Sequence, residues 1–151
     1  MKRILTLLAL VLAAGTLIAQ TDAHEFLYQS GLSTDFEGEY TSFYENGNRQ
    51  VEAQISNGTL NGQYLWYYQN GNQREVRAYK NGLFDGTWLT FNDAGQQTGL
   101  ASYREGKKHG IWLIWDDQGN KRYEMHYENG EKSGTWIMWD ANGQIVMEQI
   151  F

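Results

Sequence analysis

The 151-residue chain contains no cysteine, no proline and no basic run. Without cysteine, neither a disulfide scaffold nor thiol chemistry is available. The formal net charge is −6 at pH 7, which makes nucleic acid and anionic membrane surfaces poor partners. Proline is missing while glycine occurs 17 times and aromatic residues make up 15% of the chain. This composition is typical of many short strands joined by tight turns.

The first 19 residues have the order of a secretory signal peptide. Lys2 and Arg3 precede an apolar run from Ile4 to Ala14, and Ala19 is a small residue at the expected cleavage point. We therefore expect an exported protein, periplasmic or extracellular, with a charge of about −8 once Lys2 and Arg3 are removed. The alternative is a retained membrane anchor, because the apolar stretch approaches spanning length.

Most of the glycines recur with a period of 24 residues. The three registers are Gly38, Gly62, Gly86, Gly110 and Gly134; Gly47, Gly71, Gly95, Gly119 and Gly143; and Gly58, Gly82, Gly106 and Gly130. Such a fixed spacing indicates an internal repeat without insertions or deletions. Positions in the repeat are counted here from the first register, which is position 0.

Aromatic residues follow the same period at three positions of the repeat. Position 2 holds Tyr40, Tyr64, Trp88, Trp112 and Trp136; position 5 holds Phe43, Tyr67, Phe91, Trp115 and Trp139; position 17 holds Ile55, Tyr79, Tyr103, Tyr127 and Phe151. Each unit is too short for a helix with two turns, and its Asn-Gly pairs are hairpin signals. The pattern predicts an all-β fold, an elongated or curled antiparallel meander of about five two-stranded 24-residue repeats.

We expect residues 1–19 to be the signal peptide, residues 20–35 an N-terminal cap segment, and residues 36–151 the repeat domain. The first repeat departs from the pattern, with Thr41 where later units have Leu or Ile and Ile55 where they have an aromatic residue. Within residues 20–35, Phe26 and its neighbours predict a short helix or extended stretch that ends at Gly31, and we expect the segment to cover the open edge of the first hairpin.

The stretch HGIWLIWDDQGN, residues 109–120, contains two adjacent aspartates and is a candidate metal loop. The stretch from Asp116 to Gly119 occupies the register that holds Glu45-Asn46-Gly47 in the first unit and Gln69-Asn70-Gly71 in the second. Those turns lack the paired carboxylates that a calcium loop needs. We interpret it as a hairpin turn and expect no metal and no cofactor. The predicted structural turn residues are Gly47, Gly71, Gly95, Gly119 and Gly143.

The pattern in residues 85–136 resembles the MORN-repeat variant of bacterial proteins known as the YwqK-like antitoxin family, and the resemblance covers residues 36–151. The resemblance is carried by the G-x-W triplets at Gly86, Gly110 and Gly134 and by the turn glycines. It implies a repeat fold with structural shared positions and no catalytic residue to carry over. It also implies, as one possible role, an immunity protein that binds a toxin.

Catalytic groups are few. The histidines His24, His109 and His126 fall at different positions, whereas zinc needs three or four converging ligands. The carboxylates of the last repeat are typical of solvated surface charge. We predict that the protein is not an enzyme.

Side chains at positions 2 and 5 have opposite parity along a strand, so they should lie on opposite faces of the sheet. We expect the position-5 face, with Leu65, Leu89, Leu113 and Ile137, to line the core. The position-2 residues Trp88, Trp112 and Trp136 are then candidate partner-binding residues, although both faces can also pack within a curled sheet.

The final strand carries Ile145 and Val146 where earlier repeats carry Arg49-Gln50, Gln73-Arg74, Gln97-Thr98 and Lys121-Arg122. Either the strand folds over the core as an apolar plug, or it pairs with another chain, as in a homodimer. The sequence thus favours a non-catalytic exported scaffold that binds a protein partner through its sheet surface. The alternatives are a binder of cell-envelope glycan or lipid, and an antitoxin-type protein.

Overall fold

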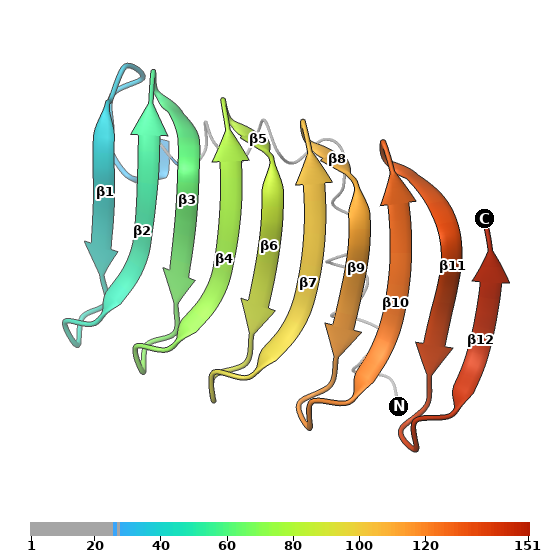
Figure 1. The fold of residues 1–151 in the computed structure, drawn as a ribbon. Coiled ribbons are helices and arrows are strands. Elements are labelled where there is room, and N and C mark those ends of the chain that lie inside the picture. Colours follow the sequence, from blue (N-terminus) through green and yellow to red (C-terminus); the bar gives the residue numbers. More distant parts are fainter. Residues whose placement is uncertain (1–25, 27) are drawn as a thin grey trace.

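The computed structural model describes residue 26 and residues 28–151. These residues form a single antiparallel sheet in which the strands follow one another in chain order (Figure 1). The predicted all-β meander is confirmed. The strands are β1 (Gly38–Phe43), β2 (Arg49–Ser56), β3 (Thr59–Tyr67), β4 (Gln73–Lys80), β5 (Leu83–Phe84), β6 (Gly86–Phe91), β7 (Gln97–Arg104), β8 (Lys107–Lys108), β9 (Gly110–Trp115), β10 (Lys121–Glu128), β11 (Glu131–Trp139) and β12 (Ile145–Ile150).

The predicted signal peptide and residues 20–25 of the cap segment lie outside the described residues. In the described part of the chain, no helix has the length and apolar character needed to cross a membrane.

The sheet has two rows of turns, one at each end of the strands (Figure 1). The five glycines predicted to hold the first row have φ between 77° and 92°, a conformation that costs glycine no steric energy. In the second row Asn57 (φ 50°) and Gly58 (φ 64°) are both left-handed, as a two-residue hairpin turn requires. Local backbone chemistry therefore fixes where each strand ends.

The sheet has more strands than one hairpin per repeat gives, because the first strand of two repeats is interrupted. β5 and β8 are two-residue strands that precede β6 and β9. The breaks fall at Asp85 and His109, directly before Gly86 (φ 109°) and Gly110 (φ 77°). The backbone N–H of Asp85 still donates to the Ala78 carbonyl at 3.0 Å, and that of His109 donates to the Ser102 carbonyl at 2.9 Å. Phe84 of β5 is part of the hydrophobic core, as is Leu60 at the same repeat position on the uninterrupted β3.

The core lies on one face of the sheet, which we call the core face. Position-2 and position-17 aromatic residues alternate along it, because the hairpin registers place them on neighbouring strands. From Tyr64 to Phe151 the ring centroids of neighbouring residues are 4.8–6.3 Å apart, with Phe84 of position 22 lying between Tyr79 and Trp88. Aromatic contacts at this spacing stabilise a core beyond the burial of their area.

The N-terminal segment completes the first repeat. Phe26 lies between Tyr40 and Tyr64, with ring centroids 5.4 and 5.6 Å away. It compensates for Ile55, which is smaller than the aromatic residue that later repeats have at position 17. The segment is also held by the N–H of Gly58, which donates to the Phe36 carbonyl at 3.1 Å.

Candidate functional site

The tryptophans predicted to meet a partner are part of the core. Trp112 is 1% exposed and Trp136 is 9% exposed. Their indole N–H groups donate to the carbonyls of Ser102 at 3.1 Å and His126 at 3.0 Å. Trp88 is partly buried and stacks on Phe84 with 5.3 Å between ring centroids. The prediction that these three residues form an exposed binding face was therefore wrong.

The reason lies in the second strand of each hairpin. Tyr103 on β7 and Tyr127 on β10 share the face of Trp112 and contact its ring on both sides, each with centroids 5.2 Å away. Position 2 thus gains aromatic neighbours from both flanking strands. Position 5 has no such set, so the expectation that its face lines the core was wrong as well.

Lysines enter this core at position 22. Phe84 occupies that position in one repeat and contacts Trp88 and Tyr103. In the next repeat Lys108 takes the same place, with its ammonium 4.8 Å from the centroid of Trp112 and 4.9 Å from that of Tyr127. Burial lowers the pKa of Lys108. The cation–π contacts offset part of the desolvation of the charge.

The other face, which we call the open face, is not covered by any element that the structure describes, because the strands form a single layer (Figure 1). Positions 3 and 14 stand directly opposite one another across it. The open-face row is the central set of these residues, Leu65, Val76, Leu89, Leu100 and Leu113, in which each residue is paired with the next. All five are partly buried by their lateral neighbours alone.

Position-5 aromatic residues lie beside this row. The hydroxyl of Tyr67 donates to Glu52 Oε2 at 2.5 Å, and the ammonium of Lys121 lies 4.5 Å from the ring centroid of Trp139. Both contacts are on the open face, because Glu52 and the Lys121 partner Glu124 continue the row at its two ends. Phe91 and Trp115 hold the equivalent position in the repeats between them.

Charged pairs border the row. Arg49 bridges to Glu52 at 3.0 Å, and Lys121 bridges to Glu124 at 2.6 Å. The hydrogen bond from Lys121 is the main reason that the pKa of Glu124 lies below its ordinary value. The open face therefore has an apolar middle and an ionic margin.

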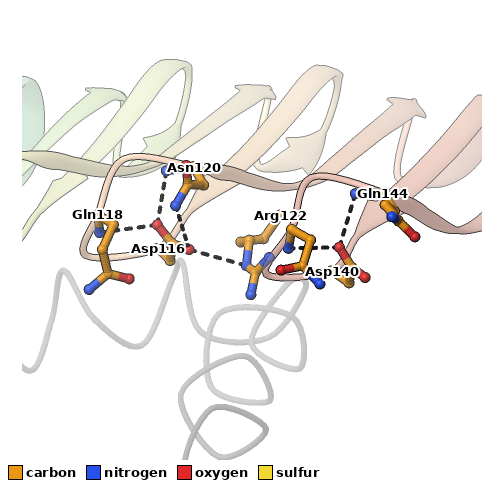
Figure 2. Close-up of polar contacts among 7 residues, drawn as sticks. Asp116, Gln118, Asn120, Arg122, Asp140 and Gln144 are labelled. Atoms are coloured by element: carbon orange, nitrogen blue, oxygen red, sulfur yellow. Dashed lines mark hydrogen bonds and ion pairs between the residues drawn. The ribbon is translucent and has the colours of Figure 1, made fainter.

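The aspartate turn has its carboxylate occupied by its own backbone (Figure 2). Asp116 Oδ1 accepts the N–H of Gln118 at 3.0 Å and of Asn120 at 2.9 Å, while Oδ2 lies 3.3 Å from the Arg122 guanidinium. Burial raises the pKa of Asp116, but these donors, led by the Asn120 N–H, outweigh it and hold the pKa below the ordinary value. Asp140 accepts two turn N–H groups in the same way. These carboxylates stabilise turns.

The candidate catalytic and metal groups do not converge in the described part of the chain. No group of three or more His, Asp or Glu residues there has the arrangement of a metal site. His109 lies between β8 and β9, and His126 lies on β10 with its Nε2 3.5 Å from Glu124. His24 lies outside the described residues.

The C-terminal strand is an edge of the sheet. β12 pairs with β11 and has no second neighbour among the described strands. Its residues Ile145, Val146 and Ile150 are 55%, 53% and 77% exposed. Phe151 packs on Trp136 with 4.9 Å between centroids yet remains 42% exposed. Phe151 and the partly buried Met147 thus contact the core, whereas Ile145, Val146 and Ile150 are exposed.

Comparison with known proteins identifies the repeat. The family model described as MORN repeat variant matches residues 36–57, 60–81, 108–129 and 132–151. Successive matches begin 24 residues apart, except across the unmatched residues 82–107. The gap holds the β5–β7 hairpin, which has the same pairing register as its neighbours. A search of curated proteins found no match. Since the matched residues make up more than half of the chain, the protein belongs to the MORN repeat variant family.

Proposed function

We propose that this protein is an exported, non-catalytic scaffold that binds a protein partner through the open face of its sheet. Repeats of its family are generally non-catalytic modules. The observation that carries the proposal is the open-face row, a line of five apolar side chains that no described element covers. An apolar surface of this kind in a sheet is a common mark of an interaction site.

The spacing of the row favours an amphipathic helix as the partner segment. Residues of one repeat lie two strands from those of the next, about 10 Å at ~4.8 Å per strand. An α-helix presents the same face every seven residues, about 10.5 Å along its axis. A helix lying across the strands can therefore place one apolar residue on each repeat, between the ionic margins at Glu52 and Glu124.

A charge pair introduced into the row tests the proposal. Leu89 and Leu100 stand directly opposite each other on β6 and β7. Leu89→Glu with Leu100→Lys removes the apolar middle and puts opposite charges across from each other, which preserves strand pairing. Thr87→Glu is the matched control, because Thr87 is exposed on the same face outside the row.

In a pull-down from cell-envelope extract, the immobilised parent and the Thr87→Glu control should retain the partner protein equally. The double variant should not retain it. Circular dichroism should show that all three chains are folded. A retained protein that binds the double variant as tightly as the parent would refute the role of the row. If the retained protein is a toxin, the scaffold acts as an antitoxin-type immunity protein.

The second candidate is a glycan binder, and the position-5 aromatic residues favour it. Tyr67, Phe91, Trp115 and Trp139 recur on every second strand of the open face, and sugar rings stack on such surfaces. Soluble cell-envelope polysaccharide should then quench the fluorescence of Trp115 and Trp139, and replacing both by phenylalanine should remove that response. A protein scaffold predicts no quenching by polysaccharide.

The export part of the proposal rests on the sequence of residues 1–19. N-terminal sequencing of the protein recovered from the periplasm or medium should begin at Gln20. Recovery of the uncleaved chain from the cytoplasm would contradict it.

A further inference from the structure

We propose that copies of this chain assemble head to tail, with β12 of one copy pairing with β1 of the next. The inference goes beyond the open-face partner and needs only the protein itself. It starts from the two ends of the sheet, since β1 pairs only with β2 and β12 only with β11 among the described strands. Repeat proteins that remain monomeric close such ends with polar capping units.

Neither end has the usual protection of an edge strand. β12 has the sequence IVMEQI, in which Glu148 is the single charged residue. β1 has the sequence GEYTSF with Glu39 as its charged residue. Exposed edges are normally blocked by lysine, proline or inward-facing charge. Within residues 28–151, no strand pairs with the outer side of either edge.

The repeat makes these two edges complementary. β12 is the second strand of the last hairpin, as β2, β4, β7 and β10 are of the earlier ones, and each of those pairs with the first strand of the next hairpin. β1 is such a first strand. The two also run in opposite directions, which antiparallel pairing requires (Figure 1).

The four internal junctions define the register. Position 14 is opposite position 3 in each of them, as Glu52 is opposite Leu65 and Glu124 is opposite Ile137. Position 13 is opposite position 4 in the same junctions, as Val51 is opposite Trp66. Applied to the ends, this register places Glu148 opposite Thr41 of the next copy, and Met147 opposite its Ser42.

The aromatic core would continue across the junction. Tyr127 has a tryptophan on each side, Trp112 at 5.2 Å and Trp136 at 5.1 Å between centroids. Phe151 has only Trp136 and is 42% exposed. In the proposed register the missing neighbour is Tyr40 of the next copy, which occupies the same repeat position as Trp112 and Trp136.

Self-pairing of two β12 strands about a two-fold axis is the competing arrangement. It would leave the β1 edge open and bring no position-2 aromatic residue to Phe151. A head-to-tail contact uses two different surfaces, so it propagates into a chain or closes into a ring. A two-fold contact stops at the dimer.

Disulfide trapping separates these arrangements, and the absence of native cysteine gives a clean background. In the full chain, Thr41→Cys and Glu148→Cys are both at exposed positions. Residues opposite each other in an antiparallel pair are close enough for a disulfide. Within one open sheet the two sites are nine strand steps apart, about 43 Å at ~4.8 Å per step, so they cannot join in the same copy.

After mild oxidation, the chain with both cysteines should give a ladder of dimers, trimers and larger species on a denaturing gel. Each single-cysteine chain should stay monomeric, and a mixture of the two should give a mixed dimer. Using Glu39→Cys in place of Thr41→Cys moves that cysteine two residues out of the proposed register on the same strand face, and it should abolish the ladder while circular dichroism shows a folded sheet. Efficient dimerisation of Glu148→Cys alone, or a monomer throughout, would overturn the proposal.

Discussion

The assignment of the core face makes a sharp prediction about two tryptophans three residues apart. Trp112 on β9 is 1% exposed and lies between Tyr103 and Tyr127, whereas Trp115 at the end of the same strand is partly exposed on the open face. Trp112→Ala should therefore destabilise the protein much more than Trp115→Ala. The two variants remove the same atoms, so that the difference between them reports the environment alone.

The magnitude follows from the burial. A tryptophan side chain buries roughly 200 Å² of mostly apolar surface, worth about 5 kcal/mol at ~25 cal/mol per Å². Replacing a buried large aromatic residue by alanine typically lowers the free energy of unfolding by about 3–5 kcal/mol. Trp115, without a covering layer, should cost about 1–2 kcal/mol. Against a total stability of about 5–15 kcal/mol, the first loss is large.

Urea denaturation followed by circular dichroism measures both losses. Acrylamide quenching gives an independent check, because Trp112→Phe should remove a shielded emitter and Trp115→Phe an accessible one. Equal losses of stability in the two alanine variants would contradict the assignment of the core face. A larger loss for Trp115→Ala would place the core on the other face and remove the basis of the open-face row.

Three further outcomes are expected. Gly119→Val should cost about 1–3 kcal/mol in urea denaturation, because its φ is 81° and a β-branched residue is strained there; a loss below about 0.5 kcal/mol would contradict the turn assignment. Millimolar calcium and EDTA should both leave the melting temperature unchanged, because turn N–H groups occupy the carboxylates of Asp116 and Asp140; a rise of several degrees with calcium would restore the metal site. Lys108→Phe should raise the urea midpoint near neutral pH, since burial lowers the pKa of Lys108 and Phe84 shows that the place fits a ring. Because the pKa of Lys108 is lower in the folded chain, the unfolded chain keeps the Lys108 proton up to a higher pH. The stability of the parent should therefore increase as the pH rises toward 10.5, and that of the variant should not.

The sequence was sufficient for the parts of the fold that depend on local chemistry. Glycine tolerates positive φ, so its spacing marks turns, and the distance between turns sets the strand length. Because the 24-residue period has no insertion, one hairpin predicts the others. The meander and the structural role of Gly119 and its equivalents followed from these facts.

The choice of core face did not follow, because alternation along a strand places aromatic residues on both faces here. Trp112 and Trp115 differ only in parity, and parity cannot say which side is covered. The answer depends on the neighbouring strands, where Tyr103 and Tyr127 come into register with Trp112. Pairing and bulges such as the shift between Thr90 and Phe91 are properties of two strands at once. The position-17 aromatic residues carried the needed signal, since they recur with the same period as position 2.

The long-range contact at the first repeat was equally hidden, and it explains why the two ends of the sheet differ. At the N-terminal end, the smaller Ile55 leaves room that Phe26 fills from outside the repeat, between Tyr40 and Tyr64. At the C-terminal end, Phe151 has one aromatic neighbour instead of two, and nothing in the described chain supplies the other. Tyr40 contacts Phe26, which also contacts Tyr64, and in the proposed junction its second aromatic neighbour is Phe151 of another copy. An assembly that joins β12 to β1 requires an incomplete set of aromatic contacts after the last repeat. Each junction then brings Tyr40 of one copy to Phe151 of the other, while Phe26 completes the contacts inside the first repeat.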